Sequence, residues 1–311
     1  MFAEGDDQRV IEAAARLRAD GLVREAILLG QSESIGRQLR PFGVREGITV
    51  ADSRALANTA RYRDEYIRAR NLSVLENEIL AAAMSNPVVQ GALMVRMGEA
   101  DGFIGGVRTS TMEILSHGIH IIKAERSIGV VTSLCVISSP DRSIGSDGLL
   151  VIADPVVNPD PSVGVLAKIA EAAAGFARSF LRITPRIAFL SYSTKGSGGG
   201  KSVEKMRLAA ARAKERMPET VIDGELQLDA AISPEVAAHK APGSALGGKA
   251  NILIFPNLDS ANIGSKILGF FGNATLIGPI IYGLKRPYND ISRAARVEDI
   301  INLSIITQLQ E

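Results

Sequence analysis

The chain has a single cysteine, Cys135, among its 311 residues, and this excludes an internal disulfide. A chain without disulfides is compatible with a reducing compartment, so we expect a cytoplasmic protein. Cys135 lies in the apolar run VVTSLCVISS, which favours a buried strand cysteine over a catalytic thiol. No apolar run reaches the ~20 residues that span a bilayer. The acidic start MFAEGDDQRV also lacks a signal-peptide pattern, so we expect no membrane association.

An excess of charge of either sign is also missing. The formal net charge is +1, from 35 basic and 34 acidic side chains, so the electrostatic footprint of a nucleic-acid-binding protein is absent. Hydrophobic residues make up 46% of the chain, enough to build ordinary packed cores. The length is comfortable for two domains.

Complete metal and nucleotide motifs are absent as well. His117 and His120 share one face of a predicted helix, but neither a cysteine nor a third histidine completes a zinc set. The three acids Asp223, Glu225 and Asp229 could bind a divalent metal or act as acid and base; alternatively, the first two begin a helix. We expect no bound metal.

What the sequence does contain is an alternation of short β-rich runs with amphipathic helical patterns. This predicts an α/β fold with two α/β/α domains and largely parallel sheets. The strongest break in composition is SSPDRSIGSDG, residues 138–148. We predict a first domain from residues 1–138 that is completed by residues 286–311, and a second domain from residues 139–285.

Two loops that follow predicted strands are candidates for ligand binding. SYSTKGSGGGKS, residues 191–202, precedes a helix and indicates an anion-binding loop or a flexible connection. It is not a Walker A motif, because the first glycine of that motif would fall on Lys195. In PNLDSANIGSK, Asn262 and Lys266 are spaced to line either a cleft or a solvated helix face.

The segment YNDISRAARVEDI, residues 288–300, brings a hydroxyl, a guanidinium and a carboxylate together. A helix begins near Arg296, so Ser292 and Arg293 precede it and Asp299 lies within it. A carboxylate near an arginine stays ionised and could act as a general base toward a thiol. The alternative is an ordinary charge pair at a helix N-terminus.

Seven stretches, in order along the chain, are similar to the phosphate acetyltransferase (phosphotransacetylase) family. They are FAEGDDQRV, GEADGFIGG…ST, SDGLLVIAD, LSYSTKGS, DGELQLDAAISPEVAAHKAPGS, GKANILIFPNLDSANIGSK and GPIIYGLKRPYNDISRAARVEDI. The resemblance implies a homodimer with an interdomain cleft and a fold related to isocitrate and isopropylmalate dehydrogenases. It also implies the reaction of acetyl-CoA with phosphate to give acetyl phosphate and CoA, without a covalent enzyme intermediate. CoA would then be a substrate, and no cofactor would be tightly bound.

The resemblance also implies roles for particular residues. Asp299 matches the general base, Arg293 the arginine that orients the acyl phosphate, and Ser292 its hydroxyl partner. Arg68 matches a further functional arginine, although Arg70 fits the spacing without a gap. The residues implied in substrate binding are Ser110, Thr111, Tyr192, Ser193, Thr194, Lys195, Gly196, Ser197, Asn262 and Lys266.

One departure from the family pattern concerns a second arginine. Ser116 stands at its place, which should weaken the binding of phosphate groups; Arg108 and Lys123 are candidates to compensate. Two alternatives stay open. One is a phosphate acyltransferase for a longer acyl group such as butyryl, and the other is a non-catalytic module that senses acetyl-CoA.

Overall fold

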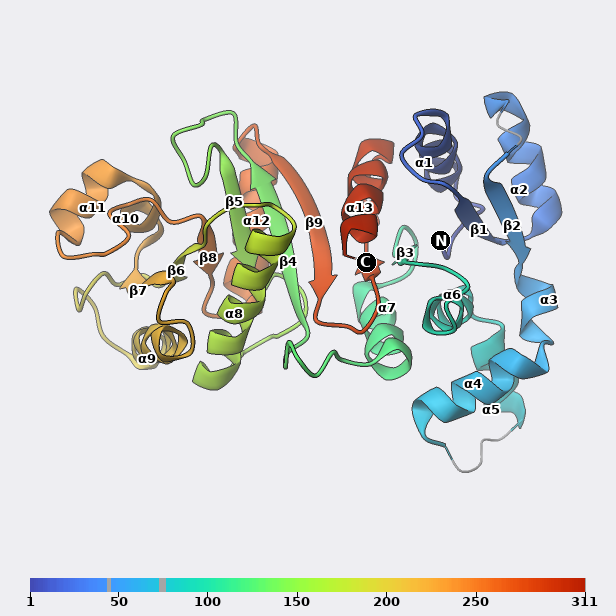
Figure 1. The fold of residues 1–311 in the computed structure, drawn as a ribbon, viewed down its shortest axis with the longest axis horizontal. Coiled ribbons are helices and arrows are strands. Elements are labelled where there is room, and N and C mark those ends of the chain that lie inside the picture. The colour runs from blue at the N-terminus through green and yellow to red at the C-terminus, as the bar shows by residue number, and fades with distance from the viewer. Residues whose placement is uncertain (44–45, 73–76, 311) are drawn as a thin grey trace. The chain divides into compact units, whose positions relative to one another are not determined.

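A computed structural model describes residues 1–43, 46–72 and 77–310. The chain divides into two compact units (Figure 1): unit 1 is Met1–Ala124 together with the residues from Leu284 onward, and unit 2 is Glu125–Gly283. The first boundary lies before the predicted residue 138. Residues 132–138 form a strand that pairs with two strands of unit 2, and this hydrogen bonding groups them with that unit.

Unit 1 is built on short parallel strands. β1 (Ala26–Gly30) pairs with β2 (Ile48–Asp52), and β3 (Phe103–Gly105) pairs with β10 (Tyr288–Asp290). The first residues of the chain join the two pairs, because Phe2 bridges in parallel to both Leu28 and Ile104. The backbone order is therefore β2, β1, the N-terminal segment, β3 and β10. The N-terminal segment and β10 were not predicted as strands.

Some helices of unit 1 begin at residues whose side chains cap them. Asp7 accepts a hydrogen bond from the Arg9 amide at the start of the first helix, and Asn86 precedes a helix with Pro87 at its first position. These helices are α1 (Gln8–Ala19), α2 (Ser32–Leu39), α3 (Ser53–Ala57), α4 (Ala60–Arg70), α5 (Asn77–Met84), α6 (Pro87–Arg96), α7 (Thr111–His117) and α13 (Val297–Leu309). A 3-10 turn (Arg40–Phe42) follows α2, and a π-helical turn (Gly118–Ile122) follows α7.

The helical composition predicted between Asp52 and Ala100 corresponds to α3–α6, apart from residues 73–76, which lie outside the described residues. No single helix in the described ranges is long and apolar enough to cross a membrane. Among the described residues, α5 and α6 meet that criterion only when taken together, and they are bent by 81° relative to each other. Residues 88–95 of α6 are all buried, as in a core helix.

Unit 2 contains one six-stranded sheet in the order β7-β6-β8-β5-β4-β9. Its strands are β4 (Thr132–Ser138), β5 (Leu149–Ala153), β6 (Arg186–Leu190), β7 (Val221–Leu226), β8 (Ile252–Ile254) and β9 (Thr275–Tyr282). β7, β6, β8 and β5 run parallel, while β4 is antiparallel to both of its neighbours. The central strands are buried nearly throughout, as strands covered on both faces should be.

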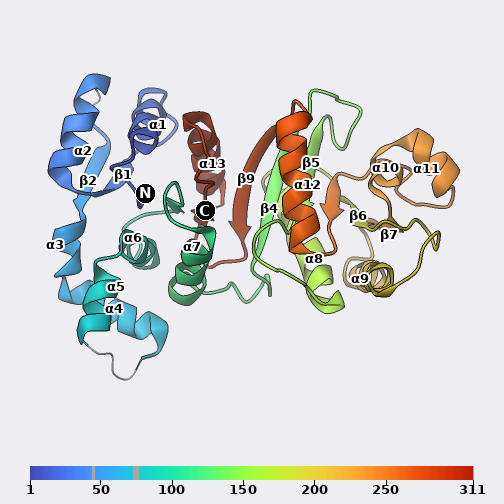
Figure 2. The same cartoon turned by 180° about the vertical axis from the view of Figure 1, so that it is seen from behind.

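Helices cover both faces of this sheet. α8 (Val163–Ser179) and α9 (Lys201–Arg216) lie in front of it in Figure 1, and α12 (Leu258–Phe271) lies in front in the reverse view of Figure 2. The short helices α10 (Leu228–Ile232) and α11 (Pro234–Lys240) follow β7. The predicted α/β fold with largely parallel sheets is confirmed.

Candidate functional site

Two loops of unit 1 leave the sheet at the same edge. The parallel pairing of Gly105 with Asp290 places the carboxyl ends of β3 and β10 side by side. The loop 106–110 follows the first strand and the loop 291–296 follows the second, and open α/β sheets bind ligands at such an edge. Ser110 caps α7, Thr111 begins it, and Ser292 and Arg293 lie in the second loop. The structure therefore brings these four predicted residues to one edge.

A buried carboxyl group joins the two strand ends. Asp290 is 1% exposed, and its Oδ2 accepts a hydrogen bond of 2.6 Å from the Thr111 hydroxyl. Its Oδ1 has no hydrogen-bond partner among the described residues. Burial raises the pKa of Asp290 to about 7. The hydrogen bond from Thr111 and the charge of Arg293 both work to lower this pKa, but burial outweighs them. Asp290 was not among the predicted site residues, because the short polar strand β10 was not predicted.

The loop 291–296 has the conformation that the sequence predicted, and α13 begins at Val297 after the N-cap Arg296. Ser292 and Arg293 are exposed, and the Ser292 hydroxyl accepts a hydrogen bond from the Ala294 amide. Asp299 Oδ2 accepts a hydrogen bond of 2.9 Å from the Arg296 amide, with Arg296 Nε at 3.4 Å. Within the described ranges, Asp299 thus forms its ion pair with Arg296 and not with Arg293, and its Oδ1 makes no hydrogen bond.

The two arginines that were considered at the end of α4 have different surroundings. The Arg68 side chain is 71% exposed and forms an ion pair with Glu65, in its own helix. Arg70 is partly buried and lies close enough to His117 of α7 for its charge to act on that imidazole. Burial is the main reason why the pKa of His117 is lowered. The negative charge of Glu113 works to raise this pKa, and the positive charge of Arg70 works to lower it. Arg70 therefore acts on the helix that carries Ser116, whereas Arg68 contacts its own helix.

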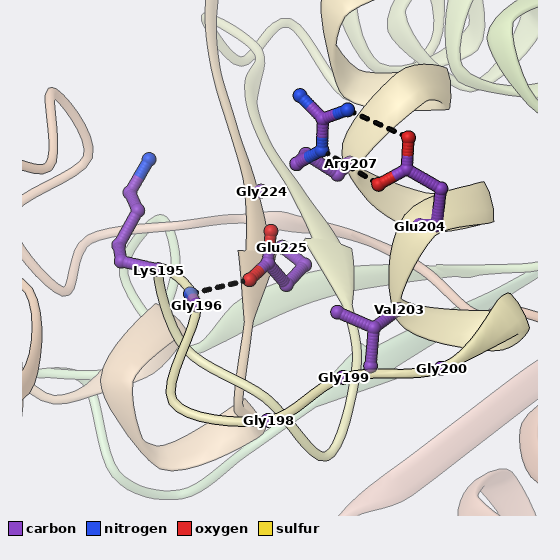
Figure 3. Close-up of a pocket in the computed structure, with 10 residues that line it drawn as sticks. All are labelled: Lys195, Gly196, Gly198, Gly199, Gly200, Val203, Glu204, Arg207, Gly224 and Glu225. Atoms are coloured by element: carbon purple, nitrogen blue, oxygen red, sulfur yellow. Dashed lines mark hydrogen bonds and ion pairs between the residues drawn. The ribbon is translucent and has the colours of Figure 1, made fainter.

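The glycine-rich loop of unit 2 already holds an anion from the protein itself. Figure 3 shows Glu225 pointing toward this loop, where its Oε1 accepts hydrogen bonds from the Gly196 amide at 2.7 Å and the Ser193 hydroxyl at 3.2 Å. The loop, β7 and the first turns of α9 surround a hollow of about 530 Å³ that is also lined by Lys195 and by Arg207, which pairs with Glu204.

Within this loop, buried residues maintain its shape and other residues face solvent. Ser193 and Thr194 are 0% and 4% exposed; Thr194 accepts a hydrogen bond from the Gln227 amide and donates one from its own amide to the Ser197 hydroxyl. Tyr192, in contrast, is 63% exposed, and its hydroxyl donates to the Gly199 carbonyl. Of the predicted residues in this loop, Tyr192, the half-exposed Lys195 and the exposed Ser197 have accessible side chains.

The acidic cluster after residue 221 is strand and not helix, which corrects one sequence interpretation. Asp223 and Glu225 lie two residues apart in β7, and both side chains are buried. Burial works to raise the pKa of Asp223, but hydrogen bonds from Lys195 and Ser244 outweigh it and the pKa lies below its usual range. Asp229 pairs with Lys240. Within the described ranges, no group of three or more potential metal ligands occurs.

The remaining candidates lie elsewhere in unit 2. Asn262 and Lys266 both belong to α12; Asn262 donates to the Pro155 carbonyl at 3.1 Å, and Lys266 is exposed. Cys135 is 3% exposed in β4, and burial raises its pKa to about 12. A thiol with such a pKa is not a nucleophile at neutral pH. The prediction of a buried strand cysteine is confirmed.

Comparisons with known proteins agree over the whole chain. A family model described as Phosphate acetyl/butaryl transferase matches residues 1–308. A phosphate acetyltransferase of Clostridium acetobutylicum is 36% identical over 311 residues, covering 100% of this chain and 93% of that protein. The crystal structure of a phosphotransacetylase from Streptococcus pyogenes has a TM-score of 0.89 at 39% identity, covering 99% of this chain and 92% of that one.

A more distant likeness concerns the fold alone. A 4-hydroxythreonine-4-phosphate dehydrogenase from Klebsiella pneumoniae has a TM-score of 0.52 at 12% identity, covering 97% of this chain and 95% of that one. This agrees with the expected relation of the fold to dehydrogenases. With a family model that matches nearly every residue and a relative 36% identical along its full length, the chain belongs to the phosphate acetyl/butaryl transferase family.

Proposed function

We propose that this protein catalyses the reversible transfer of an acetyl group between CoA and inorganic phosphate. Its relatives at about a third identity carry the name phosphate acetyltransferase, and the family model extends over residues 1–308. The structural observation that carries the proposal is the convergence of Ser110, Thr111, Ser292 and Arg293 at the carboxyl edge of the unit 1 sheet. Hydroxyl groups and a guanidinium at one edge suit an acyl phosphate.

In the proposed mechanism, CoA and acetyl phosphate bind together and Asp299 takes the thiol proton on Oδ1, the oxygen that the helix cap leaves available. The sulfur attacks the acetyl carbonyl, the bond from carbon to the phosphate oxygen breaks, and phosphate leaves. A thiol has a pKa of ~8.5, so the carboxylate contributes mainly by orientation and partial proton removal. Arg293 and the Ser292 hydroxyl stabilise the charge that develops on the carbonyl and phosphate oxygens.

We further propose that one arginine of α4 serves this site, either Arg68, which matches the family pattern, or Arg70. The Arg68 side chain is exposed and pairs with Glu65, and the charge of Arg70 acts on His117. Replacing the functional arginine by alanine should raise the KM for acyl phosphate, and the same substitution at the other arginine is the matched control from the same helix. Equal effects of the two substitutions would contradict this assignment.

In unit 2 we propose that Tyr192, Lys195 and the hollow beside Gly196 contact substrate, since these groups are accessible. The buried Ser193 and Thr194 then maintain the loop, because their hydrogen bonds are internal, whereas the exposed Ser197 remains a proposed substrate contact. Asn262 and Lys266 remain proposed substrate contacts. We expect no tightly bound cofactor.

An exposed apolar stripe on α12 supports the proposal of a homodimer. Ile263, Ile267, Phe270 and Phe271 follow the helical repeat, and the two phenylalanines are 84% and 86% exposed. Analytical ultracentrifugation should give a dimer for the wild type and a monomer for Phe271→Glu. Leu208→Glu, at an exposed leucine of α9, is the control that should stay dimeric.

The activity is tested by mixing purified protein with CoA and acetyl phosphate and following thioester absorbance. Acyl phosphates of increasing chain length decide between acetyl transfer and the butyryl alternative that the family description includes. Binding of CoA in calorimetry without turnover on any acyl phosphate would instead favour the sensing module.

The role of Asp299 has its own test. Asp299→Asn keeps an acceptor for the Arg296 amide and so preserves the helix cap. The substitution should lower kcat by about 10²-fold or more while leaving the affinity for CoA nearly unchanged. Near-normal turnover would remove Asp299 from the base role.

A further inference from the structure

We propose that Glu4 and Arg9, from the N-terminal segment Ala3–Arg9, are positioning residues that hold both loops of the unit 1 edge in their working geometry. The inference rests on the proposed function and extends it to residues that carry no assigned role. Neither side chain is placed to react with substrate, since each is engaged with the backbone of the loops.

Glu4 fixes the loop 106–109. Its carboxylate is 6% exposed and accepts hydrogen bonds from four consecutive amides and one hydroxyl. Gly106 and Val107 donate to Oε2 at 2.8 and 2.9 Å, and the amides of Arg108 and Thr109 donate to Oε1 at 2.9 and 2.8 Å. Successive amides around one anion form a rigid concavity. The loop 106–109 therefore binds the carboxylate of Glu4. This contact fixes the position of Ser110 and of the start of α7.

Arg9 connects that loop to the other one. Its Nη1 donates to the carbonyls of Arg293 at 2.8 Å and Ala295 at 3.0 Å, and its Nη2 donates to the carbonyl of Val107 at 3.0 Å. The Asp7 carboxylate accepts hydrogen bonds from Nε and Nη2 of Arg9, each at 3.0 Å. This bidentate pair orients the guanidinium plane. Only a planar cation with several donors can make all of these bonds at once, so a lysine cannot replace it fully.

This arrangement has a catalytic consequence. The carbonyl that Arg9 holds belongs to Arg293 itself, so loss of Arg9 frees the backbone from which the Arg293 and Ser292 side chains extend. Misplacement of a catalytic group by about 1 Å costs roughly 10²-fold in rate. Because Arg9 faces carbonyls and not ligand, its loss should act on kcat and leave the KM for CoA nearly unchanged.

Arg16 provides a matched control. It lies in the same helix α1 and forms an ion pair of 2.8 Å with Glu298 of α13, but it touches neither loop. Arg16→Ala removes the same charge and one contact between the same two segments of unit 1. A purely structural contribution of α1 would make the two arginine variants behave alike.

The experiment compares Arg9→Ala, Arg9→Lys and Arg16→Ala in the full chain with CoA and acetyl phosphate. We expect a kcat lower by roughly 10²-fold for Arg9→Ala, partial recovery for Arg9→Lys, and a change within about twofold for Arg16→Ala. Added guanidinium ion should restore part of the kcat of Arg9→Ala. Normal kcat in Arg9→Ala, or equal losses in both alanine variants, would overturn the proposal.

Hydrogen exchange separates this inference from the proposed function. Peptides covering residues 106–110 and 291–296 should exchange faster in Arg9→Ala than in the wild type and Arg16→Ala. If the wild type has no turnover on any acyl phosphate, the proposed function fails, and the exchange result alone decides the positioning role. Unchanged exchange in both loops would refute it whatever the activity.

Discussion

The buried carboxyl group of Asp290 should make the stability of unit 1 fall as pH rises. Its pKa is about 7 in the folded protein, compared with 3.8 as the ordinary value. Between these values the folded state keeps a proton that the unfolded chain has released, so stability decreases with pH over that window. A difference of about 3 units corresponds to about 4 kcal/mol of unfolding free energy, as an order of magnitude.

The substitution Asp290→Asn removes the titration while keeping the shape and an acceptor for the Thr111 hydroxyl. The wild-type stability minus the mutant stability should therefore fall by about 4 kcal/mol between pH 4 and pH 8. The new side-chain amide near Gly106 also changes the unfolding free energy of the mutant, but by an amount that does not depend on pH. The pH dependence, and not the absolute difference, is the quantity that tests the reasoning.

The assay is urea-induced unfolding at several pH values. Unfolding of unit 1 is followed by pulsed hydrogen exchange in the peptides that cover residues 100–110 and 286–291. Asp141→Asn is the control, because this carboxyl is exposed and the hydroxyl and amide of Ser143 lower its pKa. The difference in unfolding free energy between wild type and Asp141→Asn should not change between pH 5 and pH 8. A flat difference for Asp290→Asn as well would refute the account of a neutral buried acid.

Other substitutions test the packing and the loops. Gly106→Ala should destabilise by a few kcal/mol in thermal melts, because φ is +113° and a Cβ would lie 2.3 Å from Asp290 Oδ1; Gly164→Ala, with open space around it in α8, should not. Glu225→Ala should speed amide exchange at Gly196 and cost ~1–3 kcal/mol, whereas Glu225→Gln should retain most of the protection. The Cys135 thiol, with a pKa of about 12, should resist thiol reagents at pH 8 until urea unfolds the chain; rapid labelling of folded protein would contradict its burial.

Hydrophobic patterns in the sequence were sufficient to predict most of the fold. The alternation of strands and helices, and the start of α13 after Arg296, follow from periodicity and capping that act locally. The N-terminal segment pairs through an isolated bridge at Phe2 and β10 is three residues long, so both are too short to show any period. β7 was missed because Asp223 and Glu225 look like a helix start, and their partners Ser244 and Gly196 lie elsewhere in the chain.

The candidate site was predictable only in part, for a related reason. The loop residues Ser292 and Arg293 stand out by residue type, and a family resemblance adds their implied roles. Glu4 and Arg9 do not stand out, because an acid and a base near a helix start normally serve as a cap. Their contacts join segments 102 to 286 residues apart, and such pairings follow from the sheet order and not from local pattern.

The division of the chain also sets the order in which a newly made protein can complete its parts. Unit 2 is one uninterrupted stretch, so its sheet can form without any residue of unit 1. Unit 1 needs β10 beside β3, and these two strands lie on opposite sides of unit 2 in the sequence. Its long-range closure adds a late and entropically costly step. Until that step, the edge of β3 that pairs with β10 stays unpaired.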